Sequence, residues 1–409
     1  MITKERALKL VDHILLLPLI ISLFANANVL QPVGDLSEQD YLSLTKKPQI
    51  SWQQIGQLPA PQGYTESIGI SGAYSAFIGD YLIVAGGANF PNGHPFFDQG
   101  AKVFYSDIFV FDVNDGKLNE IAHGHLPMKS GHGATVVVGN SLYLIGGKNN
   151  QQAFNSIIKL TLDKTQKPIV EVIGRLPFTW SSGGAAWQSD ALYLFAGKQN
   201  DQVSNQVCKY SFITANCIDA STMPPIPGLM RSDFPAIHHH NHFYVFGGLN
   251  LSAGKDHYVL TDAYVFDFKK LRWKILAPIT LDKKPFSVVG GGVASLENGQ
   301  LVLLGGVNRE IFNNAILQLT TLKGNDLRAF NQDYFSLSEA DINFSRHQVT
   351  YNIANDSWDV LSDDVPFWGG AGPLTISQNG HRLYWISGEI KPVIRSPNVY
   401  LGLLSQTTQ

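Results

Sequence analysis

One short pattern recurs six times along this chain of 409 residues and constrains its fold more than any other feature. Each copy is an apolar run, which contains tyrosine in five of the six cases, followed by two small residues of which the second is glycine. The copies are residues 81–87, 142–147, 192–197, 243–248, 301–306 and 383–388. Self-similarity of this kind is typical of a repeat architecture. We therefore expect one repeated supersecondary unit rather than the two or three domains that the length alone suggests.

Each copy lies among other strand-like segments. An apolar, glycine-rich segment precedes it, an alternating run such as residues 107–112 follows, and then comes a fourth segment such as residues 273–276. Four strands with a small pair after the second resemble the kelch repeat, which builds blades of β-propellers. Glycines suit that place because inner strands crowd near the axis and the following turn needs φ values that side chains disfavour. The sequence predicts an all-β, six-bladed kelch-type β-propeller.

The last repeat predicts how the ring closes. Residues 398–404 form its third strand, and only five residues follow them. Residues 50–58, ahead of any first strand, contain Trp52, and Leu58 and Pro59 form the Leu-Pro pair that ends a fourth strand. We expect residues 50–58 to pair with the last blade, which would remove exposed strand edges. The predicted units are a signal peptide over 1–27, an extension over 28–49 and a single propeller over 50–409.

The first 27 residues resemble a secretory signal peptide. Three basic residues lie within residues 1–13, an apolar run covers residues 14–24, and Ala25 and Ala27 form an A-x-A site. The run of 11 residues is short against the roughly 20 that span a bilayer, so an uncleaved anchor is the weaker alternative. We expect cleavage after Ala27, no stable membrane insertion afterwards, and an oxidising compartment outside the cytoplasm.

The chain has two cysteines, Cys208 and Cys217, on either side of an expected turn. In an oxidising compartment they either form a disulfide or remain two buried thiols, because cross-strand cysteines meet disulfide geometry only at particular positions.

Charge and motifs exclude several classes of function. Lys and Arg total 30 against 33 Asp and Glu, for a net charge of −3, so nucleic acid is not an expected partner. HExxH, GxSxG, P-loop and helix-opening GxGxxG motifs are missing, which excludes zincins, serine hydrolases and nucleotide-binding enzymes. His238, His239 and His240, with His242, resemble metal ligands, but adjacent residues of a strand point to opposite faces and do not converge on one ion.

One mouth of the propeller is the expected binding site, because it carries the loops from strand two to strand three. The first residues after the six small pairs are Ala88, Lys148, Lys198, Leu249, Val307 and Glu389. Lys148 and Lys198 are candidate substrate contacts, and so are Arg231, Asn308 and Arg309 near the same rim. Solvated lysines and turn asparagines are the ordinary alternative.

Glu389 and Arg395 are the strongest candidates. The segment Gly388-Glu-Ile-Lys-Pro-Val-Ile-Arg395 places an acid and a guanidinium at one rim of a chain that is otherwise poor in charge. They form either a functional pair or a structural ion pair.

Two long loops are expected beside this rim. Residues 90–102 form one, and residues 320–347 form a larger insertion in which residues 327–335 are expected to be a short helix over the mouth. The insertion acts as a lid or as a structural apron.

These residues resemble the bacterial N-acetylneuraminate epimerase family, the sialic acid mutarotases, which are secreted kelch propellers. The resemblance lies in the Glu389 to Arg395 segment and in the stretches 231–248, 305–313, 333–335 and 367–372. The order of the blades resembles a cyclically permuted branch of that family. The resemblance implies that Glu389 is the acid/base and that Arg395 contacts the substrate, with Arg231 and Asn308 as further contacts.

The same resemblance implies an isomerase of the periplasm that interconverts the α and β anomers of N-acetylneuraminate or a related sialic acid, without a metal or organic cofactor. A non-catalytic glycan- or protein-binding propeller is the alternative. A copper radical oxidase is a distant third, because neither cysteine lies at a mouth loop. No oligomeric state is predicted.

Overall fold

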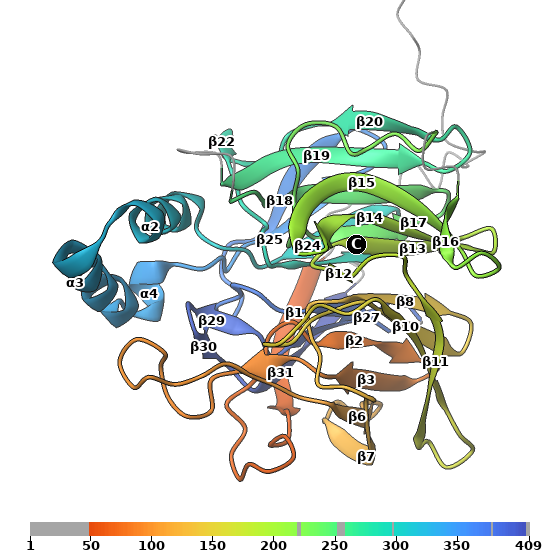
Figure 1. Ribbon diagram of the computed structural model, residues 1–409, viewed down its shortest axis with the longest axis horizontal. Coiled ribbons are helices and arrows are strands. Elements are labelled where there is room, and N and C mark those ends of the chain that lie inside the picture. Colours follow the sequence, from red (N-terminus) through yellow and green to blue (C-terminus); the bar gives the residue numbers. More distant parts are fainter. Residues whose placement is uncertain (1–48, 219–221, 252–257, 297, 378, 406–409) are drawn as a thin grey trace, which may run out of the picture.

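The computed structural model describes residues 49–405, apart from 219–221, 252–257, 297 and 378 (Figure 1). The expected signal peptide over 1–27 and nearly all of the expected extension over 28–49 lie outside the described residues and stay predictions.

Six antiparallel sheets form the blades. Blade one contains β2 (Tyr74–Ile78), β3 (Tyr81–Ala85), β6 (Asp107–Asp112) and β7 (Asn119–His125), and blade two β8 (Ala134–Val138), β9 (Ser141–Ile145), β10 (Ser156–Leu162) and β11 (Pro168–Arg175). Blade three contains β12 (Trp180–Ser181), β13 (Gly184–Gln188), β14 (Ala191–Gln199), β15 (Gln202–Ser211) and β16 (Asn216–Ile218), and blade four β17 (Ala236–His239), β18 (His242–Leu249), β19 (Val259–Asp267) and β20 (Arg272–Leu276). Blade five contains β23 (Gly292–Ser295), β24 (Gln300–Leu304), β25 (Gln348–Asn352) and β26 (Ser357–Ser362), and blade six β27 (Leu374–Ile376), β28 (Arg382–Ile386), β31 (Asn398–Ser405) and β1 (Gln49–Gln57).

Three short hairpins extend from these sheets: β4 (Ala88–Asn89) with β5 (Val103–Phe104), β21 (Thr280–Leu281) with β22 (Lys284–Pro285), and β29 (Glu389–Lys391) with β30 (Ile394–Arg395).

The inner strands form a closed ring. Each blade's first long strand contacts those of both neighbours, in the order β2, β8, β13, β17, β23, β27 and back to β2. The predicted all-β, six-bladed propeller of kelch type is therefore confirmed.

The predicted closure of the ring is also confirmed. Strand β1 pairs antiparallel with β31, so that Gln49 lies opposite Ser405 and Gln57 opposite Asn398. Trp52 of β1 makes an edge-to-face contact with Phe367, with ring centroids 5.5 Å apart. The first described strand thus supplies the outer strand of the last blade.

The core is divided among the six interfaces between blades. Apolar side chains of adjacent blades pack together at every interface. Phe77 of blade one lies 5.1 Å from Tyr384 of blade six, and Phe195 of blade three stacks on Phe243 of blade four at 4.0 Å. Burial of apolar area is the main favourable contribution to folding, so each blade depends on both neighbours.

The small pair after strand two is required by its surroundings. Gly147 has a φ of +94°, and a Cβ there would lie 2.1 Å from the Tyr74 hydroxyl oxygen. Gly388 has a φ of +107°, and its Cβ would lie 2.5 Å from the Ala371 carbonyl oxygen. Both conformation and space exclude larger residues at these two positions.

The insertion in blade five begins earlier than expected. It consists of α2 (Arg309–Thr321), α3 (Gly324–Ser336) and α4 (Glu339–Ile342), so the predicted start at residue 320 is wrong, while the expected helix over 327–335 lies within α3. Asn308 caps α2, because its side-chain oxygen accepts from the Ile311 backbone N–H at 3.1 Å. No helix in the described part of the chain is long and apolar enough to cross a membrane.

Cys208 of β15 and Cys217 of β16 form a disulfide, with Cα atoms 5.2 Å apart, which decides between the two alternatives left open by the sequence. The bond ties the outer strand of blade three to its neighbour.

Replacing both cysteines with alanine is expected to lower the free energy of unfolding by about 2–3 kcal/mol, because the bond closes a loop of about ten residues in the unfolded chain. Guanidinium unfolding of the variant and of the wild type, each with and without dithiothreitol, measures the loss. Only the wild-type midpoint should fall with reductant; a wild-type midpoint that does not respond would contradict the prediction.

Candidate active site at the propeller mouth

A belt of five backbone hydrogen bonds runs around the axis at one mouth, from blade one to blade six. A backbone N–H just ahead of the first strand of one blade donates to the corresponding carbonyl of the preceding blade, at 2.7–3.2 Å. The belt runs through Gly72, His132, Ser182, Asp233, Gly290 and Gly372. His132 and Asp233 have φ values of +60° and +55°, where glycine is usual. The belt thus carries two ionisable side chains at the mouth.

Glu389 and Arg395 meet across the β29–β30 hairpin. Arg395 Nη2 lies 3.2 Å from Glu389 Oε1, and the same oxygen accepts from the Val393 N–H at 2.9 Å. The Arg395 side chain is 5% exposed and that of Glu389 is 22% exposed. The structure therefore brings together the two predicted catalytic residues and leaves the carboxylate partly open to solvent.

Arg395 is fixed by further contacts. Its Nε donates to Ser71 Oγ at 3.2 Å, its Nη1 donates to the Val393 carbonyl, and the guanidinium lies 4.9 Å from the centre of the Phe90 ring. Burial lowers the pKa of Arg395, and the negative charge of Glu389 acts in the opposite direction. Such an oriented guanidinium suits a planar carboxylate.

Lys102 and His132 form a second polar pair in the mouth, with Nζ and Nε2 separated by 3.1 Å. The pKa of Lys102 is lowered to about 8. Burial is the largest cause, and the positive charges of Arg395 and Lys148 add to it. Burial, followed by the charge of Lys102, holds the pKa of His132 well below its ordinary value. His132 is therefore neutral near pH 7, and its Nε2 accepts from the lysine ammonium.

Lys148 and Lys198, both predicted at this rim, belong to the same electrostatic environment. Burial lowers the pKa of Lys148, and the charge of Lys198 acts in the same direction. The charges that act on one another across the mouth are those of four cations, Lys102, Lys148, Lys198 and Arg395, and three carboxylates, Glu389, Asp233 and Asp201. Cations outnumber carboxylates in this set, so the mouth favours an anionic ligand.

The other three predicted substrate contacts, Arg231, Asn308 and Arg309, lie outside this set of charges. Arg231 is fully buried and makes a bidentate ion pair with Asp262, with Nη–O distances of 2.7 and 2.8 Å. The side chain of Asn308 caps α2, and Arg309 is the first residue of that helix and is partly exposed. Their roles as substrate contacts stay predictions, and the contacts described for Arg231 and Asn308 are within the protein.

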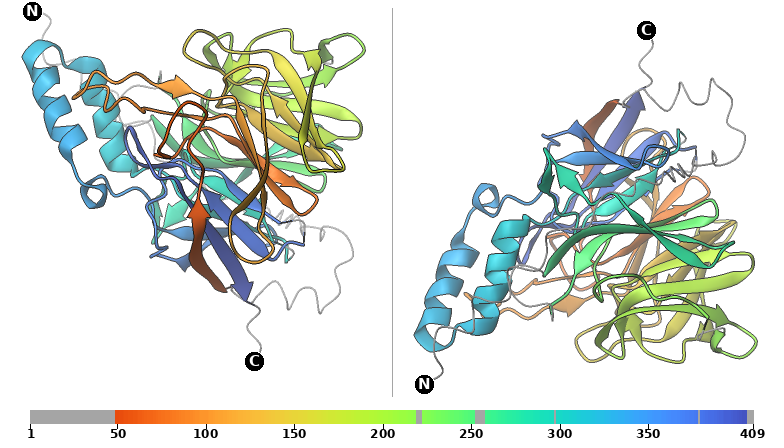
Figure 2. Two further views of the ribbon diagram at one scale, coloured as in Figure 1. Left: turned by 90° about the horizontal axis from the view of Figure 1, so that it is seen from below. Right: turned by 90° about the horizontal axis from the view of Figure 1, so that it is seen from above.

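The helical insertion and the loop over residues 90–102 meet beside the mouth. His94 and Phe96 lie 4.8 and 6.1 Å from Phe335 of α3, measured between ring centroids. Lys391 of β29 donates to the carbonyls of Phe335 and Leu337, at 3.3 and 2.6 Å. Both views of Figure 2 show the helices, in cyan and blue, on one side of the ring of blades.

Tyr334 of α3 lies within the electrostatic influence of Glu389. Burial, followed by the negative charge of Glu389, raises the pKa of Tyr334 above its ordinary value. The phenol is therefore protonated at neutral pH. The insertion thus contributes a hydroxyl group to the electrostatic environment of Glu389.

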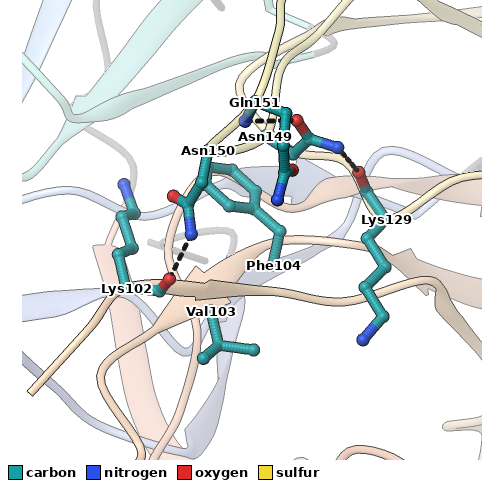
Figure 3. Close-up of a pocket in the computed structure, with 7 residues that line it drawn as sticks. All are labelled: Lys102, Val103, Phe104, Lys129, Asn149, Asn150 and Gln151. Atoms are coloured by element: carbon teal, nitrogen blue, oxygen red, sulfur yellow. Dashed lines mark hydrogen bonds between the residues drawn. The ribbon is translucent and has the colours of Figure 1, made fainter.

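A cavity of about 280 Å³ lies beside Lys102, between the strand two to three loops of blades one and two. Figure 3 shows the amide side chains that line it next to the segment from Lys102 to Phe104. Asn150 Nδ2 donates to the Lys102 carbonyl, whereas Asn149 is a turn residue whose side-chain oxygen accepts from the Gln151 N–H at 2.9 Å.

Sequence reasoning missed Lys102, His132 and Asp233. His132 and Asp233 lie ahead of β8 and β17, separated from them by one and two residues, at the positions where three other members of the belt are glycine. Lys102 ends the long loop over residues 90–102. A comparison of the six residues ahead of the first strands would have identified two of these three residues.

These features define a class, the kelch-type propellers with a cationic mouth built around one carboxylate–guanidinium pair. A family model described as N-acetylneuraminate epimerase matches residues 36–170 and 176–409. The chain belongs to the N-acetylneuraminate epimerase family. The cyclic permutation expected from its blade order stays a prediction.

Individual relatives match less of the chain. An N-acetylneuraminate epimerase of Yersinia pestis (strain Pestoides F) is 34% identical over 44% of this chain and 45% of its own length. N-acetylneuraminate epimerase 1 of Escherichia coli O6:H1 is 33% identical over 40% and 42%, respectively. The chain thus spans less than half the length of the curated relatives it matches. A solved structure described as "Structure of YjhT" matches with a TM-score of 0.59 and 14% identity over 86% of this chain and 99% of that chain, which shows the fold.

Proposed function

We propose that the protein is an isomerase that interconverts the α and β anomers of N-acetylneuraminate or a closely related sialic acid. The observation that carries the proposal is the Glu389 carboxylate, which is oriented by Arg395 and the Val393 N–H within a cationic mouth. Membership of the epimerase family supports the reaction type.

The proposed chemistry is a proton transfer at the anomeric centre. The Glu389 carboxylate accepts the proton of the anomeric hydroxyl, and a proton delivered to the ring oxygen allows the bond from that oxygen to the anomeric carbon to break. The free carbonyl turns over, and the reverse transfers close the ring on its other face. One carboxylate can shuttle the proton, and the reaction as written uses no metal or organic cofactor.

The basic groups of the mouth would hold the sugar acid. A guanidinium binds a carboxylate in a planar fork, and lysine ammonium groups add charge without a fixed orientation. Arg395 is oriented on both sides, by Ser71 and by Phe90. We assign the substrate carboxylate to the region between Arg395 and Lys102.

Anomer exchange followed by NMR tests the proposal. Freshly released α-N-acetylneuraminate is mixed with the protein, and decay of the α signals is compared with that in buffer. Acceleration supports the isomerase; saturable binding in calorimetry without acceleration would replace it with a non-catalytic glycan-binding propeller, and the absence of both would overturn both functions.

Binding of the sugar acid is expected to weaken as the pH rises through about 8, because Lys102 then loses its charge, whereas the charge is present at lower pH. We expect about a 10-fold loss of affinity between pH 7 and pH 9, which corresponds to about 1.4 kcal/mol. Calorimetry at the two values measures it. Lys102→Gln should flatten the dependence, whereas Lys129→Gln, at an exposed lysine of the same cavity, should keep it. An equally steep dependence in Lys102→Gln would contradict this assignment.

We also propose that the chain is exported to the periplasm after cleavage behind Ala27. The Cys208–Cys217 disulfide supports an oxidising compartment. The mass of the protein recovered from a periplasmic extract tests this: a chain that retains residues 1–27 would contradict it.

A further inference from the structure

A group of metal-ligating side chains lies in blade one, on β6 and β7. Asp107, His123 and His125 each offer one ligand atom, and these atoms all lie within 4.8 Å of one another. Asp107 Oδ1 and His123 Nε2 are 3.0 Å apart. The group uses none of the residues assigned to sugar binding or proton transfer.

The register of the two strands explains why the three side chains converge. Asp107 lies opposite His125, and Phe109 lies opposite His123. Side chains two residues apart on a strand share one face, so His123 and His125 are neighbours, with ring centroids 4.9 Å apart. The adjacent histidines at 238–240 lack this arrangement, because His238 bonds Gln188 of blade three and His239 bonds Ser295 of blade five.

Two of the three ligands are held in place. The Asp107 side chain is 4% exposed, and its Oδ1 also accepts from the Gln62 N–H at 3.1 Å. The His123 ring stacks on Phe109 at 4.9 Å with an interplanar angle of 5°. His125 is exposed and leaves one side of the group open to solvent.

Charge gives a second, independent argument. The equivalent residue of blade four, at the matching position of the third strand, is Asp262, which is neutralised by Arg231 in a bidentate ion pair. Within the described residues, Asp107 has no ion pair with lysine or arginine and faces imidazole instead. A nearly buried carboxylate beside two imidazoles lacks the cation that its counterpart has.

We propose that Asp107, His123 and His125 bind one divalent transition-metal ion, with zinc as the probe, and that water completes the coordination. Imidazole and carboxylate ligands at about 2.0–2.2 Å are the donors that zinc takes in proteins. The ion links the third and fourth strands of blade one and thereby fastens its outer strand. This site is separate from the proposed isomerase site, so either proposal can fail without the other.

Calorimetric titration of the untagged full chain with zinc chloride tests the site. We expect one equivalent to bind, and we expect His123→Ala and His125→Ala each to weaken binding at least 10-fold. His240→Ala, which removes an exposed histidine from the other cluster, should leave the affinity unchanged. His125 is exposed, so its replacement should not impair folding, which circular dichroism checks.

Thermal unfolding gives a second measurement. A ligand that binds only the folded chain raises its stability in proportion to the logarithm of the ligand excess. Zinc should therefore raise the melting temperature of the wild type and of His240→Ala but not that of His125→Ala. No binding by the wild type, or equal binding by all the variants, would overturn the proposal.

Discussion

Replacing Glu389 with glutamine is expected to reduce the acceleration of anomer exchange by about 10²–10⁴-fold, to near the rate in buffer, because that is the usual contribution of a positioned acid/base group. The amide retains the size of the side chain and an oxygen for the Val393 N–H. It does not accept a proton at neutral pH, so the variant changes chemistry more than shape.

The matched control is Glu310→Gln. Glu310 lies in the first turn of α2 and is exposed, so the same chemical change there should leave the exchange rate within a factor of two of the wild type. Both variants and the wild type are followed by NMR at equal concentrations, with calorimetry to establish that sugar still binds. An exchange rate unaltered in Glu389→Gln would exclude Glu389 as the acid/base.

Replacing Arg231 with methionine is expected to lower the free energy of unfolding by about 3 kcal/mol. Removal of one partner of a buried ion pair costs about 3–5 kcal/mol, and the lower end applies because the Asp262 side chain is 34% exposed and is partly rehydrated. The Gly247 carbonyl, which accepts from Arg231 Nη1 at 2.9 Å, also loses its donor.

Lys274→Met provides the comparison. Lys274 lies 3.6 Å from Asp356, and the lysine side chain is 55% exposed, so breaking this surface pair should cost less than about 1 kcal/mol. Guanidinium unfolding measures both variants, and calorimetry measures their affinity for the sugar acid. If Arg231→Met unfolds like the wild type but no longer binds sugar, its role is that of a substrate contact rather than of a structural ion pair.

The repeats made the ring predictable because each one encodes its own blade. The small pair after strand two is imposed locally, as Gly147 and Gly388 show, and its six copies determine the number of blades. Glu389 and Arg395 could be found because eight consecutive residues contain both of them. The pairing of residues 50–58 with the last strand could be predicted because the last repeat lacks a fourth strand and residues 50–58 form a strand that belongs to no other repeat.

The rest of the site depends on positions that no local motif marks. His132 and Asp233 adopt left-handed backbone conformations on the belt, and only a comparison between repeats, in which Gly72 and Gly290 occupy equivalent places, would identify them. Lys102 reaches the mouth from the end of a long loop, where no periodicity applies. The disulfide likewise depended on register, because Cys217 lies opposite Tyr210 and only the paired strands bring it near Cys208.

The pairing of β1 with β31 also determines when the ring can close during synthesis. Gln57 and Asn398, whose side chains bond across this ladder, are 341 residues apart in the chain. At 5–20 residues per second, the ribosome needs roughly 20 to 70 s to make the segment between them. Throughout that interval the ring is open, and the apolar residues of blade one that later pack against blade six, such as Phe77, lack their partners from that blade. The ring therefore closes only when its final strand has been made. A chain that stops before β31 leaves β1 and β28 without the strand that pairs with both, and unpaired strand edges promote aggregation.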